Sequence, residues 1–278
     1  MEHMVTRRHF LRLAASGFTA ASLPALAGCA NGSSVSGGSG TLKVGVRDDI
    51  SGFGYFNDRT QSYSGLEVDI AREMAQRIGY ADISCTAVTP QTRKDMLLNG
   101  DVDCLVACYS IAESREKNFD FSPAYYEDSI VMVTEGSSLI TKLSELKGHT
   151  IATMSGSNAA PQLASYLTEA GFTNGETITA NDDNSDVTFD TWHLLQYSSY
   201  QELSDALEAG ETDAMVLDGA IAKGYLNSSR TKVEDFQIGG QDYGAATQKD
   251  SELSAKVSDA IQGMLDDGTI ANLIDKWD

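Results

Sequence analysis

The feature that most constrains the fold is an alternation of short apolar runs with amphipathic helical segments. Residues 42–46 form an apolar run of strand length. Residues 69–78 then place apolar side chains on one helical stripe, and Gly79 follows as a helix stop. Residues 102–107 are apolar except for Asp103, which is typical of a parallel strand covered on both faces. This order predicts an α/β protein with a mostly parallel sheet.

One local pattern occurs twice in the chain. Residues 97–106 read LLNGDVDCLV, and residues 207–216 read LEAGETDAMV. Each segment combines a helix end, a glycine, an acidic residue, an aspartate two positions later and an apolar strand. The aspartates are Asp103 and Asp213. The repetition predicts two similar α/β lobes.

The boundaries of the two lobes follow from the segments that join them. We expect lobe I to comprise residues 41–134 and 242–278, and lobe II to comprise residues 135–241. The chain would then cross between the lobes near residues 135–138 and again near residues 237–241. Two crossings of this kind would act as a hinge.

The N-terminal segment, residues 1–29, reads as an export signal. The run TRRHFLR contains the twin arginines Arg7 and Arg8, a mostly apolar stretch follows, and LAGC ends at Cys29. A chance apolar helix with a stray cysteine is the less favoured alternative. The order predicts a lipobox whose Cys29 carries the lipid, including palmitate, and anchors an extracytoplasmic protein to the bacterial cell membrane. Residues 30–40 are a Gly/Ser-rich linker.

Charge and cysteine content exclude several functions. The formal net charge of −20 repels nucleic acid, so we expect no nucleic-acid partner. In so acidic a protein, an arginine that faces a cleft indicates a site for an anionic group. Cys85, Cys104 and Cys108 form no CxxC pair and no disulfide framework, and we interpret them as small buried hydrophobic residues on strands.

Polar side chains follow several of the expected strands. Ligands of open α/β sheets bind beyond the carboxyl ends of the strands. The residues that this rule selects are Arg47, Tyr109, Ser110, Arg115, Ser157 and Asp218. A guanidinium suits a carboxylate and an aspartate suits an ammonium group, so the set suits a zwitterionic ligand.

Four blocks of sequence together carry a resemblance to a known family. They are GLEVDIA at 65–71, YSIAESR at 109–115, LKG through SGS at 146–157 and DYG at 242–244. The chain resembles the family 3 solute-binding proteins of polar amino-acid ABC importers. That resemblance implies a type II periplasmic-binding-protein fold, with two α/β lobes joined by a two-strand hinge. It also implies a monomeric binding protein without a cofactor that delivers an amino acid to an ABC permease and its ATPase.

The resemblance also implies a role for each matching residue. Arg115 would clamp the α-carboxylate of the ligand, with Ser110 and Ser157 as further donors. Asp218 would receive the α-ammonium group, and Tyr109 would wall the ligand. Ala112 is a departure, because the family usually has threonine at that position.

The preference among amino acids depends on two further arginines. The stretches around Arg47 and Arg93 resemble those of glutamate- and aspartate-binding members, which place basic residues there for the side-chain carboxylate. The alternative for each is a solvated surface arginine. We also expect Tyr200 to line the cleft. Glutamate or aspartate is therefore the expected ligand, with a receptor for another polar amino acid as an alternative.

Other titratable residues read as structural. Glu67 and Asp69 lie at a helix start, where capping and the helix dipole explain them without catalysis. His149 and His193 are isolated, so no metal site is expected. Residues 181–186 lack the glycine and distal glutamate of an EF-hand and read as a solvated acidic loop. The remaining alternatives are a dehydratase-like periplasmic enzyme on the same scaffold and a sensor ectodomain.

Overall fold

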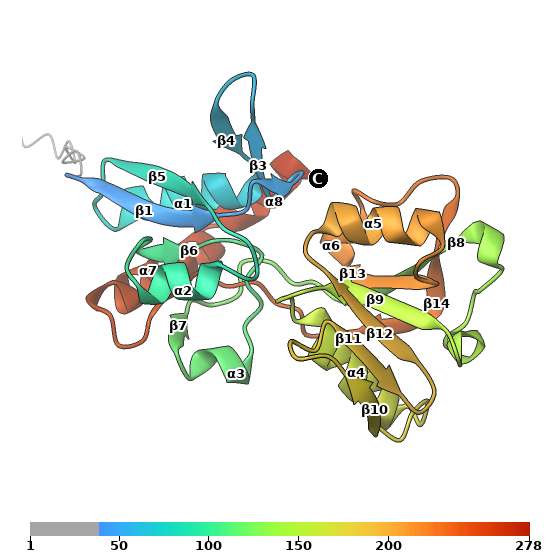
Figure 1. Ribbon diagram of the computed structural model, residues 1–278. Helices are drawn as coiled ribbons and strands as arrows, with labels where there is room; N and C mark the ends of the chain where they lie inside the picture. The colour runs from blue at the N-terminus through green and yellow to red at the C-terminus, as the bar shows by residue number, and fades with distance from the viewer. Residues whose placement is uncertain (1–38) are drawn as a thin grey trace, which may run out of the picture. The chain divides into compact units, whose positions relative to one another are not determined.

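The computed structural model describes residues 39–278, so the expected signal, Cys29 and most of the linker lie outside the described part. The described residues form an α/β structure with three sheets, which confirms the expected fold class (Figure 1). Among these residues, no helix is long and apolar enough to cross a membrane.

The first lobe is built on a five-stranded sheet with its covering helices. The strand order is β5-β1-β6-β15-β7, and β1 runs parallel to both of its neighbours. The strands are β1 (Thr41–Val46), β5 (Asp82–Ala87), β6 (Cys104–Leu105), β7 (Phe119–Phe121) and β15 (Ala246–Gln248). The helices are α1 (Leu66–Arg77), α2 (Arg93–Leu98), α3 (Glu113–Glu116), α7 (Glu252–Asp266) and α8 (Thr269–Trp277). A three-stranded sheet is formed by β2 (Asp49–Ile50), β3 (Gly54–Asn57) and β4 (Ser62–Ser64).

The second lobe is built on a seven-stranded sheet with the order β10-β11-β12-β9-β13-β8-β14. Its strands are β8 (Ile130–Glu135), β9 (Thr150–Met154), β10 (Thr177–Ala180), β11 (Asp186–Phe189), β12 (His193–Tyr197), β13 (Ala214–Asp218) and β14 (Arg230–Ile238). Its helices are α4 (Ala159–Glu169), α5 (Tyr200–Ala209) and α6 (Gly219–Ala222), with 3-10 turns at Gly136–Ser138 and Leu143–Leu146. In the first sheet β5, β1 and β6 are parallel at one edge, and β15 and β7 continue it antiparallel. In the second sheet antiparallel strands border the parallel centre of β12, β9 and β13 on both sides. The expectation of a mostly parallel sheet is therefore wrong.

The expected first crossing at residues 135–138 is wrong. Strand β8, at Ile130–Glu135, pairs with β13 and β14 and therefore belongs to the second lobe. The Gly-Ser segment after it is a 3-10 turn beyond this strand. The chain crosses before Ile130, so the expected boundary of lobe I at residue 134 is also wrong. The apolar run at 130–134 marks a strand without telling which sheet it joins.

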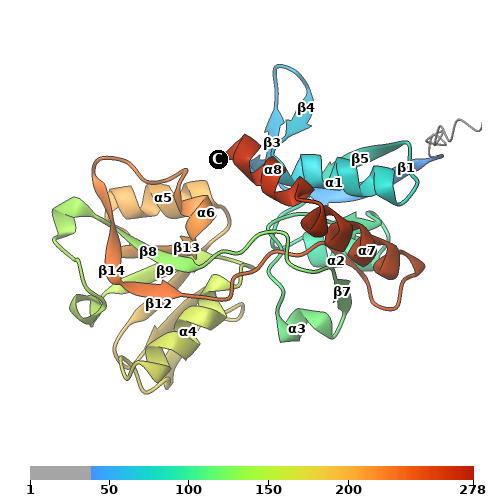
Figure 2. The same ribbon diagram turned by 180° about the vertical axis from the view of Figure 1, so that it is seen from behind.

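The two crossing segments pair with each other. The Tyr125 amide donates to the Tyr243 carbonyl at 2.9 Å, and the Tyr243 amide donates to the Tyr126 carbonyl at 2.8 Å. The Gln241 amide donates to the Asp128 carbonyl at 3.1 Å. In Figures 1 and 2 these segments run side by side. We call residues 125–129 and 239–245 the hinge segments.

The repeated sequence pattern has a repeated structural role. Asp103 accepts a hydrogen bond from the Lys43 amide at 2.8 Å, at the start of β1. Asp213 accepts one from the Thr150 amide at 2.9 Å, at the start of β9. In both lobes the aspartate amide also donates back to the carbonyl of the same residue. Gly100, with φ 77°, precedes this contact in the first lobe, and Gly210, with φ 74°, precedes it in the second. The repeat therefore ties the end of a helix to the start of a parallel strand in each lobe, β1 in the first and β9 in the second.

The half-buried Asp213 contact generates a stability prediction. Replacing Asp213 with alanine leaves the Thr150 amide without its charged acceptor, which should lower the free energy of unfolding by about 1–3 kcal/mol. The measurement is denaturant unfolding followed by circular dichroism. Asp213→Asn keeps an acceptor oxygen and should recover part of the loss. The exposed neighbour in the first-lobe repeat, Asp101→Ala, is the control. Equal stability of Asp213→Ala and wild type would contradict the assigned role.

Candidate ligand-binding site

Three arginines meet near the ends of first-lobe elements. Arg47 follows β1, Arg93 begins α2, and Arg115 lies in α3. Arg47 and Arg93 are only 1 % and 3 % exposed. The guanidinium groups of Arg93 and Arg115 lie 4.2 and 4.5 Å from the centre of the Tyr109 ring. Two of the sequence-predicted arginines of this lobe, Arg93 and Arg115, are thus brought together around one aromatic ring.

Arg93 carries a buried charge that has no carboxylate in ion-pair contact within the described residues 39–278. Its Nη1 donates to the carbonyls of Ala107 and Cys108 at 2.9 and 3.2 Å. Its buried Nε has no hydrogen-bond partner among the described residues. Burial first, and then the neighbouring charges of Arg115 and Arg47, lower the pKa of Arg93 to about 10. An anion at this point would therefore relieve both desolvation and repulsion.

Arg115 is also available to an anion. Its Nη1 donates to the Ser110 carbonyl at 2.8 Å, and it forms no ion pair within residues 39–278. Burial lowers the pKa of Arg115, while Tyr109 and Asp218 act in the opposite direction. A neutral carbonyl cannot compensate the charge of a guanidinium as a carboxylate would.

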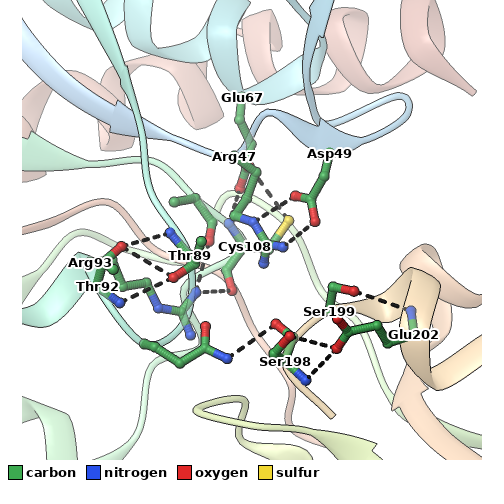
Figure 3. Close-up of polar contacts among 12 residues, drawn as sticks. Arg47, Asp49, Glu67, Thr89, Thr92, Arg93, Cys108, Ser198, Ser199 and Glu202 are labelled. Atoms are coloured by element: carbon green, nitrogen blue, oxygen red, sulfur yellow. Dashed lines mark hydrogen bonds and ion pairs between the residues drawn. The ribbon is translucent and has the colours of Figure 1, made fainter.

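Arg47 differs from the other two arginines because its charge is already opposed. Its Nε and Nη2 donate to the two carboxylate oxygens of Asp49 at 2.9 and 2.7 Å (Figure 3). Burial alone would lower the pKa of Arg47, but Asp49, together with Tyr200 and Cys108, outweighs burial and the pKa is raised. The guanidinium also lies 5.7 Å from the centre of the Tyr200 ring. A ligand contact by Arg47 stays a prediction, with less charge available than the sequence led us to expect.

Glu67 is part of the floor of this region rather than a helix cap. It is fully buried, and α1 has no side-chain cap at its start. Its Oε1 accepts hydrogen bonds from the Cys108 amide at 2.6 Å and from the Tyr125 hydroxyl at 2.5 Å. The Cys108 thiol donates to Oε2 at 3.5 Å (Figure 3). The capping interpretation of Glu67 is therefore wrong.

Cys108 also differs from its expected role. Strand β6 covers only Cys104–Leu105, so Cys108 lies in the loop beyond it, with a φ of 45°. This left-handed conformation costs a non-glycine residue about 1–2 kcal/mol. The hydrogen bonds to Glu67 hold it, and the same conformation directs the Cys108 carbonyl to Arg93. Glu67 thereby helps to place the loop that carries Tyr109 and Ser110.

Three sequence-predicted residues of the site belong to the second lobe: Asp218, Ser157 and Tyr200. Asp218 ends β13 and is 4 % exposed. Burial raises the pKa of Asp218, although hydrogen bonds from Tyr243 and Gln241 oppose the shift. Ser157 lies in the turn after β9, where its hydroxyl donates to the Met154 carbonyl at 2.7 Å. Tyr200 is buried at the start of α5.

A shared pocket and a close backbone approach connect second-lobe groups with the arginines of the first lobe. A pocket of about 330 Å³ is lined by Arg93, Tyr109, Arg115 and Gly156, among others. A Cβ added to Gly156, whose φ is 73°, would come within 3.0 Å of the Pro90 backbone. Asp218 is close enough to the arginines to affect the pKa of Arg115. Opposite charges from the two lobes and the turn at Gly156 thus lie near one another. A zwitterionic ligand between them stays a prediction.

Sequence reasoning missed four residues of this region: Glu67, Cys108, Gln241 and Tyr243. The DYG block at 242–244 marked the last of them without suggesting a contact. Their partners lie far away in sequence, up to 58 positions for Glu67, so no local pattern reveals them.

The fold and the site define a two-lobed binding protein, and comparison with known proteins places it in a family. Residues 42–278 match the bacterial extracellular solute-binding proteins, family 3, and the chain belongs to this family. It is 28 % identical over 245 residues to the ABC transporter glutamine-binding protein GlnH of Bacillus subtilis, covering 85 % of this chain and 80 % of GlnH. It is 26 % identical over 293 residues to the glutamate-binding protein GluB of Corynebacterium glutamicum, covering 98 % and 92 %.

The solved structures agree on the architecture. An ancestral arginine-binding protein bound to arginine matches with a TM-score of 0.69 and 26 % identity, covering 86 % of this chain and 98 % of that protein. This likeness confirms the type II periplasmic-binding-protein fold that the sequence led us to expect.

The buried Glu67 carboxyl generates a pH prediction. Burial raises the pKa of Glu67 above its ordinary value of about 4.3. Its contribution to the free energy of unfolding is therefore fully present below about pH 4 and is lost as the pH rises through the folded-state pKa. Glu67→Gln should consequently cost more stability at pH 4 than at pH 7, measured by denaturant unfolding at both values. A cost that increases toward pH 7 would contradict the raised pKa.

Proposed function

We propose that this protein is the extracytoplasmic receptor of an amino-acid ABC importer and that its ligand is an acidic amino acid, glutamate or aspartate. The observation that carries the proposal is the pair of arginines, Arg93 and Arg115, that lack a carboxylate partner among the described residues. An acidic amino acid has two carboxylates and one ammonium group. The site offers two uncompensated guanidinium groups and Asp218.

The proposed assignment gives each group of the ligand one opposite charge. Arg115 binds the α-carboxylate, with Ser110 and the turn at Ser157 as further donors. Asp218 receives the α-ammonium group. Arg93 receives the side-chain carboxylate, and Tyr109 and Tyr200 wall the ligand.

The charge of the ligand side chain favours glutamate or aspartate over glutamine and arginine. The relatives are named for glutamine, glutamate and arginine. A glutamine side chain would leave the buried Arg93 without an anion, which is costly in a site of low water content. An arginine side chain would face Arg93 and add a like charge. Glutamate and aspartate compensate Arg93 instead.

The family supports binding followed by delivery, without chemistry on the ligand. Closure of two lobes around a hinge is a known way of coupling ligand binding to recognition by a partner. The proposed partner is an ABC permease with its ATPase, and the proposed receptor acts as a monomer.

The proposed importer role requires the protein to remain near the membrane. Cys29 would carry the lipid, and residues 30–40 would connect it to the folded part.

The anchoring proposal predicts a change of location for Cys29→Ser. This variant should leave the membrane fraction, since the residue that carries the lipid is removed. Immunoblotting of membrane and soluble fractions measures the change, and Ser33→Ala in the linker is the control. An uncleaved and unmodified N-terminus in membrane-purified wild type, detected by mass spectrometry, would refute the proposal.

The proposed ligand predicts unequal effects of two arginine substitutions. Arg93→Gln should weaken glutamate or aspartate binding by about 2–5 kcal/mol, roughly thirtyfold or more, because a ligand carboxylate loses its buried partner. Glutamine and asparagine binding should change much less. Arg47→Gln should have a smaller effect on the acidic ligands, since Asp49 already opposes its charge. Isothermal titration calorimetry at physiological salt measures all four ligands.

The exposed Arg72→Gln is the matched control, because Arg72 pairs with Asp69 on the surface of α1. If Arg93→Gln weakened the amides and the acids equally, Arg93 would not contact the side-chain carboxylate. If wild type bound no amino acid but converted a carboxylated metabolite, an enzyme on this scaffold would replace the receptor.

A further inference from the structure

A continuous path of buried hydrogen bonds joins Asp218 to the hinge segments. Asn158 Nδ2 donates to Gln241 Oε1 at 3.0 Å, and Gln241 Nε2 donates to Asp218 Oδ1 at 2.9 Å. The Tyr243 hydroxyl lies 2.7 Å from Asp218 Oδ2 and 3.1 Å from Asp128 Oδ2. Gln241 and Tyr243 are buried to 1 % and 0 % exposure. Both belong to the second hinge segment, and Asp128 belongs to the first.

The donors along this path have fixed directions. Asn158 donates to the amide oxygen of Gln241, so the amide nitrogen of Gln241 must face Asp218. The Tyr243 hydroxyl has one proton and two carboxylates within reach, and the shorter contact is to Asp218. Both carboxylate oxygens of Asp218 therefore accept from side chains of one hinge segment.

Asp128 and Asp218 depend on these side chains to different degrees. Asp128 also accepts from the amides of Ser129 and Ala220, at 2.8 and 3.0 Å. Within residues 39–278, Asp218 accepts from Gln241 and Tyr243 alone. Removing the Tyr243 hydroxyl thus leaves Asp128 held by two backbone donors, whereas Asp218 keeps only Gln241.

The two donors still leave room for a ligand. An ionised carboxylate has about four lone-pair sites, of which two are used here. The other two can accept from an ammonium group, provided that the carboxylate does not rotate. The Gln241 and Tyr243 contacts fix that rotation from opposite oxygens.

We propose that Gln241 and Tyr243 are positioning residues, which aim the Asp218 carboxylate at the ligand's ammonium group and so make ligand affinity depend on the pairing of the hinge segments. This rests on the proposed function, because it needs a ligand with an ammonium group at Asp218. It assigns to the hinge a part in recognition, in addition to the movement of the lobes.

The backbone of the hinge supports the connection. The Tyr243 amide donates to the Tyr126 carbonyl, and the Gln241 amide donates to the Asp128 carbonyl. The rings of Tyr126 and Tyr243 stack at 5.8 Å with an interplanar angle of 18°. A change in the pairing of the segments would therefore move the donors of Asp218 directly.

The test is a double-mutant cycle on ligand affinity with Tyr243→Phe, Asp218→Asn and the double variant. Tyr243→Phe keeps the ring and removes one hydrogen bond to a charged group, so it should weaken binding about tenfold or more. In the Asp218→Asn background the same change should weaken binding less than about threefold, because the charge that Tyr243 orients is gone. A merely structural role would give the same factor in both backgrounds.

Tyr80→Phe is the matched control, since it removes a tyrosine hydroxyl beyond the end of α1, outside the hinge segments. It should bind like wild type. Gln241→Met removes the second donor and should repeat the pattern of Tyr243→Phe, which keeps the test usable if one variant does not fold. Circular dichroism and thermal unfolding identify such a variant.

The wild-type ligand panel separates this proposal from the proposed specificity. If wild type prefers glutamine or arginine, the acidic specificity fails, and the cycle is measured with the preferred amino acid. Equal losses in both Asp218 backgrounds would overturn the positioning role. Absence of binding to any amino acid would overturn both proposals.

Discussion

The rest of the site depends on the concentration of positive charge in a region with little water. Arg47, Arg93 and Arg115 are close enough for the first and third to lower the pKa of the second. Among these three arginines and within residues 39–278, only Arg47 forms an ion pair with a carboxylate. The protein as a whole carries a formal net charge of −20, so these buried cations are a local exception that a bound anion can compensate. The proposed ligand follows from this imbalance rather than from the names of relatives.

In the first lobe, backbone carbonyls and the buried Glu67 carboxyl hold the Arg93 guanidinium in place. Glu67 fixes the loop at Cys108, and the carbonyls of that loop accept from Arg93. In the second lobe the opposite charge, Asp218, is held by two side chains of a hinge segment. The hydroxyl of Tyr125, on the other hinge segment, reaches Glu67. Both halves of the proposed recognition site are therefore attached to the hinge.

Sequence reasoning worked where the structure depends on neighbouring residues and failed where it depends on distant ones. The repeat around Asp103 and Asp213 was recognisable because the glycine and the aspartate are close in sequence, whereas the amides that bind these aspartates, at Lys43 and Thr150, lie 60 and 63 positions away and were not predicted. The first crossing was misplaced, because an apolar run predicts a strand but not its sheet. Glu67 was misread, since its partner Cys108 lies 41 positions away. The pair of Arg47 with Asp49, only two positions apart, was visible in the sequence and not weighed.

The central claim is that the uncompensated charges of Arg93 and Arg115 select a ligand with two carboxylates. Calorimetric titration of the wild-type protein with L-glutamate, L-aspartate, L-glutamine and L-arginine at physiological salt tests it most directly. The account predicts that glutamate or aspartate binds at least about tenfold more tightly than the other two, because a buried guanidinium without an anion costs more than about 1.4 kcal/mol. Equal or tighter binding of glutamine or arginine would contradict it.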